Sequence, residues 1–286
     1  VKYLAGGIIF CMEQAAVNSQ HNARKFANFT QVELLHIGQR YHIYRAFDAG
    51  QRAVLIKTPA ADVPSRRDVM TLRKIYDLLA HRQVPGMLVP LGFELDGQSA
   101  ILILKPAGDI CLAELALAGP LGKDRFLKLA IKLASALAAI HDQKIIHGQV
   151  WPQNIMLDSD EAVTLIDFGR ATLLDASERL QIDAVRPMRL DGPILYLAPE
   201  QTGRMNTPVD QRTDLYSLGA VFYELLTGVP PFNMTDPLEL VHAHLSKAPV
   251  APHKVKGTVP LVLSNLVMKL LNKSPEERYQ SATGLI

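Results

Sequence analysis

The chain has 286 residues, of which 48% are hydrophobic, and a formal net charge of +2. This length is enough for one large domain or for two lobes with a substantial core. Because the charge is nearly balanced, we expect neither nucleic acid nor a membrane as a partner. The two cysteines, Cys11 and Cys111, do not make a disulfide framework, which predicts a reducing, cytoplasmic location.

The N-terminal residues 1–30 show little periodicity and are predicted to be a tail or linker. Their apolar stretch is far shorter than the about 20 residues that cross a membrane, and it lacks the pattern of a signal peptide. The chain begins with Val1 instead of methionine and stops inside a helix predicted over residues 278–282. We therefore expect a piece of a longer protein with a truncated C-terminus; arbitrarily chosen ends are the alternative.

The residues from 31 to 104 are predicted to form a small, strand-rich lobe with one main helix. Alternating or continuous apolar stretches, bounded by turn-forming residues, predict strands over residues 41–47, 53–57, 87–93 and 100–104. Ser65 begins the predicted helix, in which apolar side chains recur every three or four residues. These side chains belong to Val69, Leu72, Tyr76 and Leu79.

A hinge is predicted over residues 105–108, and residues 109–286 are predicted to form a larger, mostly helical lobe. Residues 155–157 and 163–166 flank a polar turn, which indicates a hairpin. Residues 215–227 are apolar on nearly all sides, which predicts a helix buried in the core. A second helix has an apolar face made of Phe126, Leu129, Ala130, Leu133, Leu137 and Ile140. The expected fold class is therefore α+β with two lobes.

Six short motifs follow one another along the chain. They are Val54-Leu-Ile-Lys57, the loop at Asn154, Asp167-Phe-Gly169, Ala198-Pro-Glu200, Asp214-Leu-Tyr-Ser-Leu-Gly219 and Arg278. Their order and spacing match those of protein kinases. The chain from about residue 31 to 286 therefore resembles a protein kinase domain of the Ser/Thr type. Residues 198–206 are also similar to kinase domains at the front of large multidomain bacterial signalling proteins.

The resemblance implies roles for several polar residues that this chain keeps. Lys57 would contact the phosphates of ATP, and the oxygen atoms of Asn154 and Asp167 would hold Mg²⁺. The alternatives are an ordinary strand lysine and a plain Asp-Phe-Gly turn. The residues that the resemblance places around the nucleotide are Gly38, Ile43, Leu55, Lys57, Lys105 and Met156.

Other matching residues are implied to hold the fold without chemistry. His147 and Phe168 would stack in the hydrophobic spine of the family, so His147 is interpreted as a buried, satisfied histidine. Asp214 would accept backbone N–H groups of the catalytic loop. Glu200 and Arg278 would form a buried ion pair, which mainly fixes geometry.

The positions that carry out phosphoryl transfer in the family have changed here. Gln149 stands where the family has the aspartate that accepts the proton of the substrate hydroxyl, and an amide cannot take up a proton near neutral pH. Trp151 replaces a lysine that steadies the transferring phosphate. Pro193 replaces a threonine that, in the family, bonds to this lysine and to the catalytic aspartate. Gly148 replaces the arginine that receives an activation-loop phosphate, so control by that pairing is not expected.

The nucleotide-binding residues are also altered. The family's glycine-rich loop maps onto residues 36–41, which keep only Gly38 of three glycines, and Tyr41 would crowd the phosphates. Leu55 adds bulk where adenine would lie. Ile75 replaces the helix glutamate that pairs with the lysine, and Asp77 lies about 200° further around the helix. We therefore expect ATP and Mg²⁺ to bind weakly or not at all.

Three functional hypotheses remain open. The first is a pseudokinase that acts through a protein partner or through downstream domains of the same polypeptide. The second is an atypical Ser/Thr kinase that transfers the ATP γ-phosphate to protein hydroxyls, because this reaction relies mainly on positioning and electrostatics. The third, a small-molecule phosphotransferase, is disfavoured by the Ala198-Pro-Glu200 motif and by the lost aspartate. A basic cluster, Arg66, Arg67, Arg73 and Lys74, is interpreted as a solvated helix face.

Overall fold

The computed structural model describes residues 26, 28–38, 40–96, 99–174 and 194–286. This part of the chain divides into two compact units between Gly108 and Asp109. We call them the N-lobe, which ends at Gly108, and the C-lobe, which begins at Asp109.

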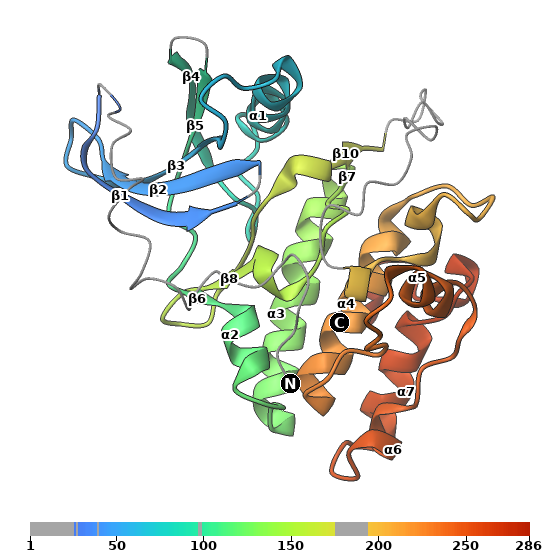
Figure 1. Cartoon of the computed structure of the whole chain (residues 1–286). Helices are drawn as coiled ribbons and strands as arrows, with labels where there is room; N and C mark the ends of the chain where they lie inside the picture. The colour runs from blue at the N-terminus through green and yellow to red at the C-terminus, as the bar shows by residue number, and fades with distance from the viewer. Residues whose placement is uncertain (1–25, 27, 39, 97–98, 175–193) are drawn as a thin grey trace. The chain divides into compact units, whose positions relative to one another are not determined.

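The described N-lobe consists of a five-stranded antiparallel sheet, in the order β1-β2-β3-β5-β4, and one helix, α1 (Figure 1). The strands are β1 (Thr30–Ile37), β2 (Tyr41–Phe47), β3 (Ala53–Pro59), β4 (Pro90–Asp96) and β5 (Ser99–Leu104). Four of them match predicted strands, although β4 is shifted three residues towards the C-terminus. We did not predict β1 separately, because the side chains of this edge strand are at most half-buried and leave a weak pattern.

Helix α1 (Arg66–Leu79) begins where the sequence predicts it. Ser65 has an extended backbone, and its hydroxyl accepts the N–H of Asp68 at 3.2 Å, so it acts as the N-cap. A cap of this kind contributes about 1 kcal/mol. The helix contacts β4 and β5. Its buried side chains are Leu72, Ile75, Leu78 and Leu79.

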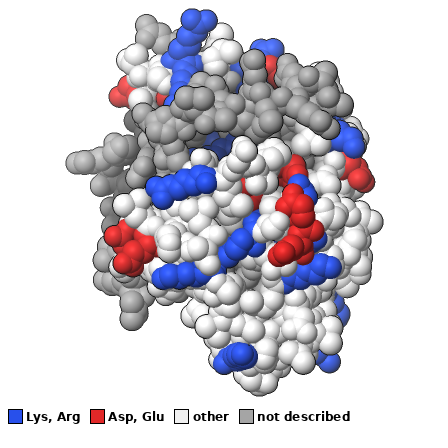
Figure 2. Space-filling model, turned by 90° about the vertical axis from the view of Figure 1, so that its right-hand side faces the viewer, with Lys and Arg blue, Asp and Glu red and all other residues white. Residues whose placement is uncertain are grey.

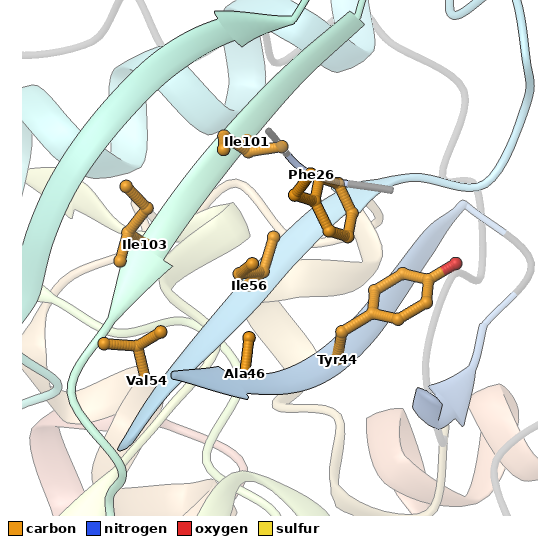
Figure 3. Packing of buried hydrophobic residues seen from close by; sticks show 7 residues of the cluster. All are labelled: Phe26, Tyr44, Ala46, Val54, Ile56, Ile101 and Ile103. Atoms are coloured by element: carbon orange, nitrogen blue, oxygen red, sulfur yellow. The ribbon is translucent and has the colours of Figure 1, made fainter. Parts of the chain in front are cut away.

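One face of the N-lobe sheet is covered by an apolar cluster (Figure 3). Its buried members are Phe26, Tyr44, Ala46, Val54, Ile56, Ile101 and Ile103. They alternate along β2, β3 and β5, as expected for one face of a sheet. Phe26 lies before β1, and its ring meets that of Tyr44 edge-on at 5.3 Å. The N-lobe therefore begins before residue 31, the boundary that we predicted.

The C-lobe is mostly helical, which confirms the predicted α+β fold with one β-rich and one α-rich unit (Figure 1). Its helices are α2 (Leu112–Leu117), α3 (Lys123–Asp142), α4 (Gln211–Thr227), α5 (Pro237–Ser246), α6 (Pro252–Val255) and α7 (Leu261–Leu270). Its short strands are β6 (Ile110–Cys111), β7 (Ile145–Ile146), β8 (Ile155–Leu157), β9 (Val163–Leu165) and β10 (Thr172–Leu173). Strands β6, β8 and β9 form one small sheet, and β7 pairs with β10.

Helix α4 is the buried centre of the C-lobe, as its apolar sequence predicts. It begins four residues before the predicted segment, because the carboxylate of Asp210 caps it by accepting the N–H of Arg212 at 2.8 Å. Gly228, with φ of +83°, ends it in the left-handed conformation that favours glycine. A Cβ on Gly219 would lie 2.6 Å from the Cβ of Leu270, so this glycine allows α7 to approach closely.

The helix predicted over residues 278–282 is absent, and this prediction was wrong. A short 3₁₀ turn, η5 (Pro275–Glu277), ends at Arg278. The Arg278 guanidinium donates to the carbonyls of Asn272 and Lys273, and the side-chain amide of Gln280 donates to three further carbonyls. These local side-chain bonds satisfy the backbone in a non-helical conformation.

Charged side chains on the surface are mixed in sign. On the face drawn in Figure 2, Lys and Arg side chains lie among Asp and Glu side chains. Arg212, for example, contacts Asp210 at 2.7 Å and Glu276 at 3.5 Å. On α1, Arg73 pairs with Asp77 at 2.9 Å and both side chains are exposed, as expected for a solvated helix face. None of the helices in the described ranges is both long and apolar enough to span a membrane.

Candidate functional site

The loop that contains the predicted catalytic position, residues 147–154, is held by a buried carboxylate from α4. Asp214 accepts the backbone N–H groups of His147 at 2.8 Å and of Gly148 at 2.7 Å. It also lies 2.9 Å from Nε2 of His141 in α3. These bonds confirm the positioning role predicted for Asp214, and they join the loop to two long helices.

Gly148 needs to be a glycine in this loop. Its φ of +73° is left-handed, and a Cβ there would lie 3.2 Å from the carbonyl oxygen of Arg170. Any side chain at this position would therefore be strained and crowded. The arginine that the family carries here could be restored only if the loop and residue 170 moved apart.

His147 and Phe168 stack as predicted. Their rings meet edge-on with centroids 4.5 Å apart, and Phe168 is buried. Nε2 of His147 lies 3.0 Å from the carbonyl of Ile166, and Nδ1 accepts the N–H of Gln149 at 3.2 Å. Burial lowers the pKa of His147 despite the nearby Asp214 carboxylate, so the ring is neutral with its proton on Nε2. This is a satisfied core histidine and not a catalytic base.

Asp167 adopts a strained conformation at the start of the 3₁₀ turn η2 (Phe168–Arg170). Its φ of 60° and ψ of 70° are left-handed, which costs a non-glycine residue about 1–3 kcal/mol. Its carboxylate accepts the N–H of Gly169 at 3.3 Å. Strain of this kind is concentrated at functional sites, because the surrounding structure has to maintain it.

Gln149 lies beside the Asp-Phe-Gly turn. The residue is buried, with 7% of its surface exposed. A Cβ built on Gly169 would be 4.0 Å from Oε1 of Gln149 and 3.2 Å from Oδ1 of Asp167, so the amide and the carboxylate both lie next to this glycine. Trp151 is half-buried in the same loop. Pro193 lies outside the described residues, so the predicted meeting of three altered positions stays a prediction.

The two predicted metal ligands are brought together by the β8–β9 hairpin. Asn154 immediately precedes β8 and Asp167 follows β9, and the N–H of Ile166 donates to the carbonyl of Asn154 at 2.9 Å. The side-chain N–H of Asn154 donates to the carbonyl of Gln149 at 3.0 Å, which leaves Oδ1 as its acceptor atom. Two hard oxygen donors fit Mg²⁺, which takes its other ligands from water and phosphate.

Where the structure is described, no three His, Cys, Asp or Glu side chains form a group that could hold a metal ion. A Mg²⁺ ion at Asn154 and Asp167 would therefore depend on oxygen atoms from a bound phosphate or from water. When bound in this family, such an ion neutralises charge on the phosphates. Whether Asn154 and Asp167 bind it stays a prediction.

In the N-lobe, three of the predicted nucleotide residues share one face of the sheet. Ile43 pairs with Lys57 across β2 and β3, and Leu55 lies two residues before Lys57 on the same strand. Residues opposite each other, or two apart, point to the same side of a sheet. This is the face opposite to the Phe26 cluster, and the half-buried Leu55 occupies part of it.

The altered glycine loop lies between β1 and β2. The N–H of Gly38 donates to the carbonyl of Tyr41 at 3.1 Å. A Cβ on Gly38 would lie 2.6 Å from that carbonyl, so only glycine fits. The Gly38 amide is thus used inside the loop and is not offered to a phosphate, which fits the expected poor phosphate binding.

The helix position expected to pair with Lys57 carries a buried apolar residue. Ile75 of α1 is 3% exposed. Asp77 is exposed and engaged by Arg73, with Nε 2.9 Å from Oδ1. The Glu–Lys ion pair of the family cannot form at residue 75, and Asp77 does not replace it.

Of the remaining predicted residues, one belongs to each lobe. Lys105 is exposed and follows β5 in the N-lobe, where its N–H donates to the carbonyl of Val89 at 2.9 Å. Met156 is half-buried on β8 in the C-lobe and pairs with Cys111 and Thr164. Their contact with a nucleotide stays a prediction.

The buried ion pair of the C-lobe is present as predicted. Two parallel bonds of 2.7 and 2.9 Å join the Arg278 guanidinium to the Glu200 carboxylate, and both side chains are fully buried. Thr213 adds a hydroxyl bond to Glu200 at 2.8 Å. The pair fixes the 3₁₀ turn η4 (Pro199–Thr202) against the end of the chain.

Sequence reasoning missed one residue that holds the catalytic loop. Nε2 of Gln201 donates to the carbonyl of Gly148 at 2.8 Å, and its Oε1 accepts the N–H of Ala198 at 3.0 Å. Gln201 thus links η4 to the loop that contains Gln149. The available signal was the position of Gln201, three residues after Ala198, where Gln or Glu side chains cap the start of a helical turn.

The comparisons with known proteins agree with these observations. The family model described as "Protein kinase domain" matches residues 29–285. A probable serine/threonine-protein kinase of Clostridium perfringens is 38% identical over 168 residues, which are 59% of this chain and 24% of that protein. Serine/threonine-protein kinase PknB of Mycobacterium leprae is 37% identical over 168 residues, 58% of this chain and 26% of that protein.

A third relative matches over a shorter region. The hybrid signal transduction histidine kinase G of Dictyostelium discoideum is 57% identical over 90 residues, which are 32% of this chain and 3% of that protein. The matched regions thus span about a quarter or less of the relatives' own lengths. Because the family model covers nearly all of the sequence, from residue 29 to 285, this chain belongs to the protein kinase domain family.

Proposed function

We propose that this kinase domain is a pseudokinase, a regulatory module that keeps the kinase fold but transfers phosphate weakly or not at all. The observation that carries the proposal is the buried Gln149 at the position of the proton acceptor. Its neutral amide has no basic atom that takes up a proton near neutral pH, so it cannot act as a general base. Its side chain and the Asp167 carboxylate both lie next to Gly169, in the turn where the family's chemistry takes place.

Two further residues support the same conclusion. Trp151 puts a large neutral ring where the family has a cation for the transferring phosphate. Ile75 is buried within the N-lobe. Helix α1 therefore has no carboxylate at the position that would pair with Lys57 and order it. Each change removes a charge, and electrostatic positioning is the main source of catalysis in phosphoryl transfer.

A pseudokinase acts through what it binds. We propose that the target is a protein partner or another domain of the same polypeptide. The support is the length of the relatives: the matched regions make up only 3% to 26% of their chains, so most of each relative lies outside the region similar to this domain. A hybrid signal transduction histidine kinase among them agrees with a role in signal transduction.

The test combines a thermal-shift titration with ATP and Mg²⁺ and an assay of phosphate transfer from γ-labelled ATP. A ligand that binds the native state raises the melting temperature as its concentration increases. We expect the wild type to transfer no more phosphate than Asp167→Ala. Gln149→Asp alone should not restore activity, because Trp151 and Ile75 remain. Asp158→Ala, which removes a carboxylate from the turn of the same hairpin, serves as the matched control.

The second candidate is an atypical Ser/Thr kinase with residual activity. It is favoured by the retained Lys57, by the two oxygen donors at Asn154 and Asp167, and by the stacked His147 and Phe168 that keep the Asp-Phe-Gly turn in place. Its mark would be Mg²⁺-dependent transfer that disappears in Asp167→Ala and persists in Asp158→Ala. That result, or robust transfer by Gln149→Asp, would refute the pseudokinase proposal.

A further inference from the structure

Tyr41 joins the glycine loop to helix α1 within the N-lobe. It is the first residue of β2 and stands where the family has the third glycine of its phosphate-binding loop. Its carbonyl accepts the N–H of Gly38 at 3.1 Å, and its hydroxyl donates to the carbonyl of Asp68 at 3.3 Å. Tyr41 is therefore held at its backbone carbonyl by Gly38 and at its hydroxyl by the first turn of α1.

Two cations lie near this ring. Nζ of Lys57 is 5.0 Å from the ring centroid, and the guanidinium carbon of Arg40 is 5.5 Å from it. Cations within about 6 Å of an aromatic centroid are attracted to it, more strongly when water is excluded. Lys57 is 8% exposed, so its contact with Tyr41 is largely shielded from water.

A network around Asp68 keeps Tyr41 in this position. The Asp68 carboxylate pairs with Arg40 at 2.6 Å and accepts the Ser65 hydroxyl at 2.5 Å. Partial burial raises the pKa of Asp68, but the bonds from Ser65 and Arg40 outweigh it and hold the pKa below the ordinary value. Asp68 is therefore ionised at neutral pH. Arg40 and Tyr41, adjacent in the loop, are both attached to the same residue of α1.

We infer that Tyr41 is a built-in competitor for phosphate at Lys57. The ring lies against the Lys57 ammonium group, which would otherwise contact the phosphates of a nucleoside triphosphate. The Asp68 network holds the ring in this position. Phosphate oxygens therefore compete with the ring for the Lys57 ammonium group. The inference deepens the proposed function, since it gives a physical reason for weak nucleotide binding that is independent of the lost proton acceptor.

The test measures the affinity of the whole chain for ATP, inorganic tripolyphosphate and adenosine by calorimetric titration, each with Mg²⁺. Tyr41→Gly removes the ring and restores the family's residue. Tyr41→Phe is the matched control, because it keeps the ring near Lys57 and removes only the hydroxyl bond to Asp68. A Tyr41→Gly, Lys57→Met double variant shows whether any gain passes through the lysine. Melting curves without ligand verify that each variant folds.

We expect Tyr41→Gly to bind ATP and tripolyphosphate at least about tenfold more tightly than the wild type, which corresponds to about 1.4 kcal/mol. Adenosine affinity should stay unchanged, Tyr41→Phe should gain much less than Tyr41→Gly because it keeps the ring, and Lys57→Met should abolish the gain. Unchanged or undetectable binding of both phosphate ligands in Tyr41→Gly overturns the inference. So does an equal gain for adenosine, or a gain that survives Lys57→Met.

These outcomes are separate from those of the proposed function. If Tyr41→Gly binds ATP tightly but transfers no phosphate, both the inference and the pseudokinase proposal stand. If the wild type transfers phosphate in a manner that depends on Asp167, the pseudokinase proposal fails whatever Tyr41 does.

Discussion

Replacing Gln201 with alanine tests how far the catalytic loop depends on the segment that follows it. The substitution removes two partly buried hydrogen bonds, of 2.8 Å to the carbonyl of Gly148 and of 3.0 Å from the N–H of Ala198. Each such bond contributes about 1 kcal/mol, so we expect a loss of about 2 kcal/mol. For a chain of this size that loss lowers the melting temperature by roughly 4 °C.

The assay is thermal unfolding followed by circular dichroism, together with amide hydrogen exchange at Ala198. Gln211→Ala is the matched control, because it removes one exposed bond, from the side chain to the carbonyl of Gln280 at 2.8 Å. Such a surface change should stay within about 0.5 kcal/mol. Exchange at Ala198, whose N–H loses its acceptor, should accelerate in Gln201→Ala alone. The reasoning is refuted if the two variants lose equal stability and exchange at the same rates.

Two further predictions concern buried charges of the C-lobe. Glu200→Gln should destabilise the fold by about 3–5 kcal/mol in urea unfolding, because Arg278 is left buried without its counter-charge, and adding Arg278→Met should recover part of the loss. Burial, followed by the charge of Arg278, lowers the pKa of Lys273 from 10.5 to about 8. Because the unfolded chain then binds more protons between these values, wild-type stability should rise from pH 8 to 10.5 relative to Lys273→Met, and a flat difference would contradict this.

The predictions that held were those that rested on buried polar residues with fixed partners. Asp214, Glu200 and Arg278 are each surrounded by donors or acceptors from distant parts of the chain. Burial without such partners would be costly, so their position in a motif already implies the contact. The helix begun by Ser65 held for a similar reason, because its capping bond is local and depends on neighbouring residues alone.

The contacts that we did not predict join segments far apart in the sequence. Their partners are backbone groups, which every residue has, so the residue types do not indicate which segments meet. Gln201 reaches a carbonyl 53 positions away, and any long side chain with an amide could do so. The Tyr41 hydroxyl bonds to a backbone carbonyl at Asp68, which every residue possesses. We predicted that Tyr41 would crowd phosphates, but not that its ring would lie beside Lys57, because that distance depends on the pairing of β2 with β3.

The burial of Phe26 changes where this folding unit should be taken to start. The family model begins at residue 29, three positions after this ring. A domain cut at that point would keep every motif of the family and still expose the part of the sheet face that Phe26 covers beside Tyr44. The domain boundaries given by the family model are therefore narrower here than the unit that folds. A domain expressed for study should begin upstream of Phe26.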